Sequence, residues 1–259
     1  MAYSLEEAKK LIIKAGLELC KKKLIARTWG NISARISDTE FVITPSGIPY
    51  DKVNNNNLVV VKIEDCSWSG DVKPSGEKKV HAAIYKARPD VNFILHTHQN
   101  YATAISVDGL DKDFVPVAKY GLPSTKTLVN NVANAVINNK NKNAVLMSRH
   151  GAVIYSDNYD DAFKTALELE EKSKALFDKV ATKKSAKQEA KPYLDDYAQM
   201  FGHSKKAVEE DKEAVELIKF KNSLAASYQK KLKPMKCLDV ALQHFIYKKK
   251  YSKLASKAK

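Results

Sequence analysis

Three histidines in this sequence have the type and spacing to hold a metal ion. His96 and His98 lie two positions apart at the end of an apolar segment, and His150 stands between two other apolar segments. Alternate residues of an extended chain point to the same side, so both imidazoles of the pair can face one ion. Catalytic zinc sites commonly combine three protein ligands with one open position, whereas structural sites are closed and often rich in thiolates. The histidines therefore predict a catalytic metal site, with Zn²⁺ as the expected ion and another divalent metal as the alternative.

A carboxylate near these histidines would extend the chemistry to proton transfer. A lone His-x-His pair can also be two packed core residues. The presence of both Glu77 and His150 favours the metal site over that interpretation. Glu77 opens a helical segment, and general acid–base catalysis by such a group contributes roughly 10²–10⁴-fold. Acidic residues are also favoured at helix starts through the macrodipole, which is the competing interpretation. His81, one helical turn later, is expected to pack or to orient a neighbour rather than to bind metal.

Short strands and helices must bring these residues together, because they lie far apart along the chain. An N-terminal helix is expected from Leu5 to about Lys22, with Ser4 and Glu7 in capping-box spacing. Turn residues bound the strands expected at 31–36, 40–44, 58–63, 91–96, 143–147 and 152–155. Further helices are expected at 76–86, 101–106, 127–138 and 159–180. Runs of adjacent short strands indicate antiparallel pairing.

Two parts are expected along the chain, with different charge. Residues 1–180 form the predicted catalytic domain, and residues 181–259 form a polar linker, a helical appendage and a Lys-rich tail. The formal net charge is +14, and the second part contributes most of it, with 19 Lys and Arg against 9 Asp and Glu. It contains no arginine cluster and no aromatic RNA-binding signature. A solvated basic tail is therefore expected, and nucleic acid is not an expected partner.

Features of membrane and secreted proteins are not evident in the sequence. No uninterrupted apolar run approaches the roughly 20 residues that cross a bilayer, and the first ten residues do not resemble a secretory signal. Cys20, Cys66 and Cys237 are widely separated and odd in number, which suits reduced thiols better than a disulfide framework. The expectation is a cytoplasmic protein without membrane attachment.

Five motifs follow one another in the first 180 residues. They are Thr28-Trp29-Gly30-Asn31-Ile32-Ser33, Ile43-Thr44-Pro45-Ser46-Gly47-Ile48-Pro49-Tyr50, Pro74-Ser75-Gly76-Glu77, His96-Thr97-His98 and Arg149-His150-Gly151-Ala152. In this order they resemble the class II aldolase/adducin family, which includes fuculose-phosphate aldolase and ribulose-phosphate 4-epimerase. The resemblance implies an α/β fold, a three-layer α/β/α sandwich with a central, largely antiparallel sheet. It also implies Zn²⁺ held by the three histidines, an acid–base role for Glu77, and a homotetramer.

The same resemblance implies a phosphate cradle built from small-residue turns. Its expected members are Gly30, Asn31, Ser46, Gly47, Ser75 and Gly76. Backbone N–H groups and small polar side chains in such turns can face an anion. Without the family context, each Ser-Gly pair would be interpreted simply as a turn. The resemblance therefore predicts a sugar phosphate as the substrate.

The predicted reaction is cleavage of a ketose 1-phosphate, similar to fuculose 1-phosphate, into dihydroxyacetone phosphate and an aldehyde. Pentulose-phosphate 4-epimerase and methylthioribulose-phosphate dehydratase are alternatives on the same scaffold. A non-catalytic module, as in adducin, is the alternative of another class, but adducin lacks the metal ligands retained here. The resemblance implies two tyrosines that assist the aldolases. Val117 stands at the position of the first, with Tyr120 as a candidate substitute, and Tyr193 and Tyr197 are the candidates for the second, C-terminal one.

Overall fold

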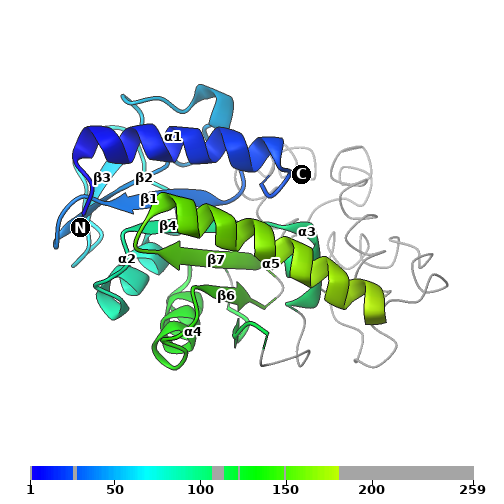
Figure 1. Ribbon diagram of the computed structural model, residues 1–259. Coiled ribbons are helices and arrows are strands. Elements are labelled where there is room, and N and C mark those ends of the chain that lie inside the picture. The colour runs from blue at the N-terminus through cyan, green and yellow to red at the C-terminus, as the bar shows by residue number, and fades with distance from the viewer. Residues whose placement is uncertain (1, 26–27, 107–113, 122, 149, 181–259) are drawn as a thin grey trace, which may run out of the picture.

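The computed structural model describes residues 2–25, 28–106, 114–121, 123–148 and 150–180 (Figure 1). These residues form a seven-stranded sheet flanked by helices. The strands are β1 (Asn31–Arg35), β2 (Glu40–Ile43), β3 (Val59–Lys62), β4 (Phe93–Thr97), β5 (Val117–Ala118), β6 (Ala144–Met147) and β7 (Gly151–Ser156). The helices are α1 (Leu5–Lys21), α2 (Lys78–Ala87), α3 (Asn100–Ile105), α4 (Lys126–Ile137) and α5 (Tyr159–Val180), with a short 3-10 helix η1 (Tyr50–Lys52).

The order of strands in the sheet is β3-β2-β1-β4-β7-β6-β5. Neighbouring strands are antiparallel, except that β5 and β6 are parallel, so the expected largely antiparallel sheet is confirmed. In the centre, Asn31 of β1 lies opposite His96 of β4, and Thr97 of β4 lies opposite Ala152 of β7. This register brings the start of β1, the end of β4 and the start of β7 to one end of the sheet.

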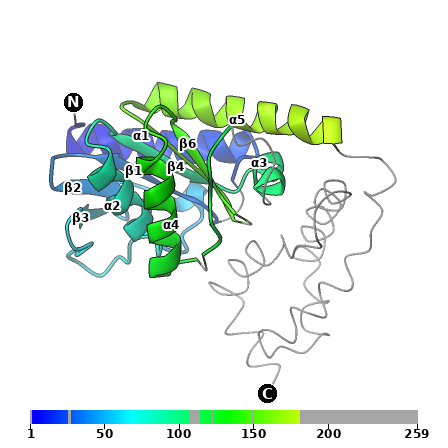
Figure 2. The ribbon, with the colours of Figure 1, turned by 90° about the horizontal axis from the view of Figure 1, so that it is seen from below.

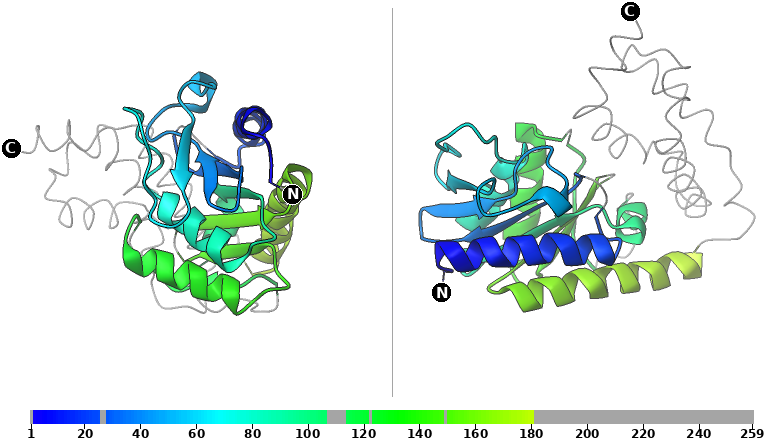
Figure 3. Two further views of the ribbon diagram at one scale, coloured as in Figure 1. Left: turned by 90° about the vertical axis from the view of Figure 1, so that its left-hand side faces the viewer. Right: turned by 90° about the horizontal axis from the view of Figure 1, so that it is seen from above.

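Helices cover both faces of the sheet and give the expected three layers (Figures 2 and 3). Helices α1, α3 and α5 share one apolar core with the sheet, and α2 and α4 share the other. Alternate residues of β4 divide between these cores: Phe93 and Leu95 face the first, and Ile94 faces the second. A strand buried on both faces has a continuous apolar sequence, which explains the segment before His96.

Helix α1 begins where the capping pattern predicts. The hydroxyl oxygen of Ser4 accepts a hydrogen bond from the Glu7 N–H at 3.3 Å. Helix α5 lies beside α1 (Figure 1), and the Tyr159 hydroxyl donates to the Glu18 carboxylate at 2.5 Å. The other predicted helices and strands end within two residues of the observed ones. The sequence did not indicate β5, because two residues are too few for a periodic pattern.

Within the part of the chain described, no helix is long and apolar enough to cross a bilayer. Helix α5 is the last described element and ends at Val180. Residues 181–259, with the expected appendage and Lys-rich tail, lie outside the described residues. The division of the chain at residue 180 therefore stays a prediction.

Candidate metal centre

The imidazoles of His96, His98 and His150 converge at one end of the sheet. One potential ligand atom from each residue lies within 4.8 Å of the other two, and the ring centroids are 4.7 to 5.0 Å apart. His96 belongs to β4, His98 directly follows this strand, and His150 directly precedes β7. All three side chains are buried. The structure therefore brings together the three residues that the sequence proposed as ligands.

A backbone carbonyl sets the tautomer of His96. The Nδ1 atom lies 2.9 Å from the carbonyl oxygen of Ala152, which can only accept, so Nδ1 carries the proton. In the neutral ring, Nε2 then presents its lone pair to the cluster, 3.0 Å from Nε2 of His98. Two nitrogen ligands of a tetrahedral zinc site stand about 3.3 Å apart when each Zn–N distance is about 2.0–2.1 Å. The donor set fits such an ion, and a carbonyl partner is typical of metal-binding histidines.

The Glu77 carboxylate faces these imidazoles. Its Oε2 lies 3.1 Å from Nε2 of His96, and its Oε1 lies 3.4 Å from Nε2 of His150. Glu77 is the N-cap of α2, yet its side chain makes no capping hydrogen bond to that helix, and only 2% of the residue is exposed. The geometry favours a role in the site over the stabilisation of a helix start by a surface carboxylate.

The charges in this cluster suit a cation. A carboxylate oxygen and the Nε2 lone pair of His96 repel each other at 3.1 Å unless a proton or a metal ion lies between them. The cluster is buried, and a buried charge without a partner costs several kcal/mol. A divalent ion satisfies both conditions. His96, His98 and His150 would hold it, and Glu77 would lie next to it.

Two glycines allow neighbouring strands to approach the metal residues closely. A Cβ atom at Gly151 would lie 2.3 Å from the carbonyl oxygen of Thr97. A Cβ atom at Gly30 would lie 2.4 Å from the carbonyl oxygen of His96, and Gly30 has a φ of 78° in the left-handed region. A larger residue at either position would push a strand away from β4. The glycines of the two motifs therefore have a packing role at the site.

Replacement of Gly30 by Ala is expected to destabilise the fold more than replacement of Gly70 by Ala. Both glycines have positive φ, 78° and 86°, so both variants carry a left-handed backbone cost of roughly 1–2 kcal/mol. Only Gly30 also approaches another strand, since no atom lies within 4 Å of a Cβ at Gly70. We expect overpacking at Gly30 to remove about 1–3 kcal/mol more from the free energy of unfolding. Urea unfolding measures both values, and equal losses would contradict this explanation.

The six residues expected to cradle a phosphate lie in three neighbouring segments: Gly30 with Asn31, which opens β1, and the turns at Ser46-Gly47 and Ser75-Gly76. The Ser46 N–H donates to the carbonyl of Lys73 at 2.8 Å, and the Ser75 N–H donates to the carbonyl of Thr44 at 3.0 Å. The Thr44 hydroxyl accepts the N–H of Ile32 at 3.1 Å, which connects the start of β1 to the two turns. Two of the backbone N–H groups therefore hold the turns together.

Two buried polar residues near the site were not predicted from the sequence. They are Ser33 and Tyr85, which join His81 in one hydrogen-bonded group. The expectation that His81 orients a neighbour agrees with its contacts to Asn31 and Ser33. Spacing could have indicated Tyr85, because Glu77, His81 and Tyr85 recur every four residues and so share one face of α2.

The aromatic residues near the turns have different surroundings. Tyr50 packs in the core, where burial raises the pKa of its hydroxyl well above the usual value. The Trp29 ring lies 5.8 Å from the His98 ring and is buried beside the metal residues. Val117 forms part of β5, and Tyr120 is 37% exposed. Tyr193 and Tyr197 lie outside the described residues.

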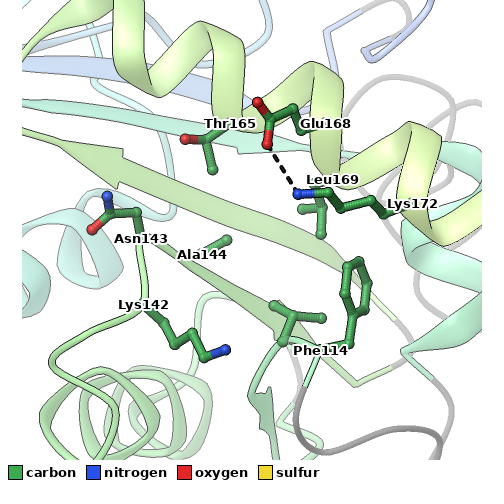
Figure 4. Close-up of a pocket in the computed structure, with 9 residues that line it drawn as sticks. Phe114, Lys142, Asn143, Ala144, Thr165, Glu168, Leu169 and Lys172 are labelled. Atoms are coloured by element: carbon green, nitrogen blue, oxygen red, sulfur yellow. Dashed lines mark hydrogen bonds and ion pairs between the residues drawn. The ribbon is translucent and has the colours of Figure 1, made fainter.

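A separate cavity of about 140 Å³ lies between α5 and β6 (Figure 4). Its lining consists of Phe114, Val115, Lys142, Asn143, Ala144, Thr165, Glu168, Leu169 and Lys172. At its rim, Lys172 pairs with Glu168 at 3.0 Å, and this ion pair lowers the pKa of the Glu168 carboxyl. None of the clustered histidines lines this cavity. The cavity is therefore separate from the histidine cluster.

The family described as "Class II Aldolase and Adducin N-terminal domain" matches residues 10–177, which is more than half of the chain. The chain belongs to this family. The resemblance inferred from the motifs is thereby confirmed, and the histidine cluster and Glu77 lie within the matched region. Class II aldolase family proteins are metal-dependent, which agrees with a cluster of three imidazoles that could hold a metal ion.

Relatives of this class II aldolase family protein have different named activities. L-fuculose phosphate aldolase of Escherichia coli (strain K12) is 32% identical over 171 residues, which cover 61% of this chain and 77% of the aldolase. 3-oxo-tetronate 4-phosphate decarboxylase of Haemophilus influenzae is 30% identical over 185 residues, with 65% and 86% covered. The probable L-ribulose-5-phosphate 4-epimerase UlaF of Mycoplasma pneumoniae is 30% identical over 197 residues, with 64% and 79% covered. Family membership alone therefore does not select the reaction.

A solved structure supports the same fold. The structure of an L-fuculose 1-phosphate aldolase superposes with a TM-score of 0.58 at 31% sequence identity. The superposition covers 67% of this chain and 86% of the aldolase. The seven-stranded sheet with helices on both faces is thus a class II aldolase fold.

Proposed function

We propose that the protein is a divalent-metal-dependent aldolase that cleaves a ketose 1-phosphate, of the fuculose 1-phosphate type, into dihydroxyacetone phosphate and an aldehyde. The observation that carries this proposal is the convergence of three imidazoles and the Glu77 carboxylate in one buried cluster. The similarity to L-fuculose phosphate aldolase supports the choice of reaction. Zn²⁺ is the proposed ion, because three imidazoles with an open position suit it.

Glu77 would move the proton that the cleavage reaction needs. When the bond between C3 and C4 breaks, the C4 hydroxyl loses its proton to give the aldehyde, and C3 gains a proton to give dihydroxyacetone phosphate. A divalent ion, when bound, supplies Lewis-acid stabilisation of the negative charge on the neighbouring oxygens. Glu77 lies beside the proposed ligands and would protonate C3, or remove that proton in the reverse reaction.

The three neighbouring segments would bind the phosphate group of the substrate. The Ser46 and Ser75 N–H groups hold the turns together, so we assign phosphate binding to the serine hydroxyls and to the adjacent glycine backbone. Small residues in turns allow an anion to approach the backbone closely. The cradle would hold the phosphate while the sugar carbons extend toward Glu77.

Replacement of Ser46 by Ala is expected to weaken binding of phosphorylated ligands selectively. A hydrogen bond to a charged group contributes about 1.5–3 kcal/mol, so dihydroxyacetone phosphate should bind roughly tenfold more weakly or worse. Dihydroxyacetone, which lacks the phosphate, should lose little affinity. Ser37→Ala is the matched control, because Ser37 lies in the turn between β1 and β2, at the other end of these strands. Calorimetric titration gives the affinities, and equal losses for both ligands would reject Ser46 as part of the cradle.

Two reactions on the same scaffold remain as second candidates. They are epimerisation and decarboxylation, because relatives of the chain are named as an epimerase and a decarboxylase. Dehydration of a methylthioribulose phosphate is a further alternative. Metal-loaded protein would be incubated with a ketose 1-phosphate, a pentulose 5-phosphate, a 3-oxo-tetronate 4-phosphate and a methylthioribulose phosphate. NMR spectra of the products would identify the reaction. Cleavage of the ketose 1-phosphate alone is the expected result.

We further propose that the enzyme is a cytoplasmic homotetramer. Light scattering after gel filtration measures the number of subunits in the assembly.

A non-catalytic module, as in adducin, is the alternative to any enzyme. Retention of Glu77 and the three histidines argues against it. Purified protein without stoichiometric metal and without turnover of any ketose phosphate would support the module instead.

A further inference from the structure

A line of buried polar side chains runs from Glu77 away from the metal residues, between α2 and β1. The Asn31 Nδ2 donates to Oε2 of Glu77 at 3.1 Å, and the Asn31 Oδ1 lies 2.5 Å from Nε2 of His81. The His81 Nδ1 lies 2.6 Å from the Ser33 hydroxyl, which lies 2.8 Å from the Tyr85 hydroxyl. None of the five residues is more than 2% exposed. They form a continuous hydrogen-bonded row that ends on the proposed acid–base residue.

Chemistry sets the direction of every hydrogen bond in this row. An ionised Glu77 only accepts, so the amide of Asn31 must turn its nitrogen toward Glu77 and its oxygen toward His81. The oxygen needs a donor, so His81 carries its proton on Nε2. The Nδ1 atom of the neutral ring then accepts from Ser33, and Ser33 accepts from Tyr85. Complete burial lowers the pKa of His81 to about 3, which agrees with a neutral ring.

We propose that His81 is a positioning residue that fixes the carboxylate of Glu77, through the side chain of Asn31, in the orientation required for proton transfer. This inference rests on the proposed acid–base function of Glu77. His81 determines which end of the Asn31 amide faces Glu77. Without that donor the amide can rotate, and its oxygen would then repel the carboxylate.

The elements on either side make this row rigid. Glu77, His81 and Tyr85 share one face of α2, and Asn31 and Ser33 share one side of β1. The guanidinium of Arg35, two residues further along β1, donates to the backbone carbonyl of Tyr85 at 2.8 Å and so ties the far end of the row. The helix and the strand therefore hold the row between them.

The row orients Glu77 but does not carry its proton away. An amide does not readily accept and release protons, so Asn31 interrupts any relay between Glu77 and His81. The proton that Glu77 exchanges must therefore go to the substrate or to solvent on the side of the metal residues. His81 thus acts through geometry, and its replacement should lower the rate of proton transfer without removing the metal.

Two amide replacements of His81 separate this role from simple packing. In His81→Gln, the side-chain nitrogen can reach the position of Nε2 and donate to Asn31. In His81→Asn, the shorter side chain reaches only the position of Nδ1, which faces Ser33. Partners of this kind beside a metal site typically contribute 10–100-fold to activity or metal affinity. We expect both variants to keep their metal content. Compared with the wild type, His81→Asn should exchange the C–H proton of dihydroxyacetone phosphate with D₂O roughly 10-fold to 100-fold more slowly. His81→Gln should recover most of the wild-type rate.

A measurement without turnover provides the second test. Long-range ¹H–¹⁵N NMR of the wild-type protein with ¹⁵N-labelled histidine reports the ring tautomer, and sequential assignment of the wild-type protein identifies the His81 signals. We expect a proton on Nε2 alone. A proton on Nδ1, or a doubly protonated ring, would overturn the inference even if neither variant folds.

The outcomes also separate this inference from the proposed function. If folded, metal-loaded His81→Asn exchanges the C–H proton of dihydroxyacetone phosphate as fast as the wild type, the positioning role is overturned. The proposed function then remains intact. If His81→Asn and His81→Gln lose the same share of the exchange rate, His81 contributes only packing, and the positioning role is again overturned. No exchange in the metal-loaded wild type would reject the proposed function, and the positioning role with it.

Discussion

Replacement of Glu77 by Gln is expected to leave a folded, metal-loaded protein that binds dihydroxyacetone phosphate but exchanges its reactive proton roughly 10²-fold or more slowly. Gln preserves the size of the side chain, and its carbonyl oxygen can still accept from Asn31. The amide cannot act as a base at neutral pH. Proton NMR of the ligand in D₂O measures the exchange, and elemental analysis measures the metal.

Glu6→Gln is the matched control for this experiment. Glu6 lies in the first turn of α1 on the surface, where its carboxylate pairs with Lys9 at 4.0 Å and contributes about 0.3–1 kcal/mol to the stability of a helix start. The control should exchange the ligand proton at the wild-type rate. If Glu77→Gln, loaded with metal, also exchanges at a near-normal rate, Glu77 has no acid–base role and the proposed mechanism is wrong.

Replacement of His96 or His98 by Ala is expected to remove the metal and, with it, all activity above background. Each variant takes one imidazole from a set of three whose ligand atoms lie within 4.8 Å of one another. Most of the fold should remain, because a catalytic zinc ion is seldom the main source of stability. Elemental analysis of the purified variants gives the metal content, and circular dichroism shows whether the fold is kept.

Glu77→Gln serves as the control for the histidine variants, since it changes the same cluster while keeping three imidazoles. It should retain stoichiometric metal, whereas His96→Ala and His98→Ala should not. Chelation and metal addition should abolish and restore the activity of the wild type. Full metal occupancy in both histidine variants would show that these residues are not the ligands.

The cluster itself shows why the sequence was informative about the site. His96 and His98 share a strand period, and a strand can place alternate side chains on one side. The motif glycines are informative for a similar reason, because a backbone without Cβ atoms is required where Gly30 and Gly151 approach β4. Local periodicity and residue type therefore predicted the candidate ligands and most of the helices and strands, and the resemblance of the motifs to a known family supplied the class of fold.

The row from Glu77 to Tyr85 shows where the sequence was not sufficient. The motifs assigned Asn31 to phosphate binding, and the structure shows its side chain hydrogen-bonded to Glu77 and His81. No pattern in the sequence pairs β1 with α2, so the partners of Ser33 and His81 could not be inferred. Those contacts depend on how a helix lies over a sheet.

The sequence by itself determined which residues could do chemistry and which short segments would carry them, because strand and helix periods are local properties of the chain. The tertiary structure decided which of these residues meet. Pairing of β1 with β4 sets Asn31 opposite His96, and packing of α2 over β1 brings Glu77 and His81 to Asn31. These contacts join residues far apart in the sequence, and they follow from strand register and from packing of the apolar cores, which only the folded chain specifies.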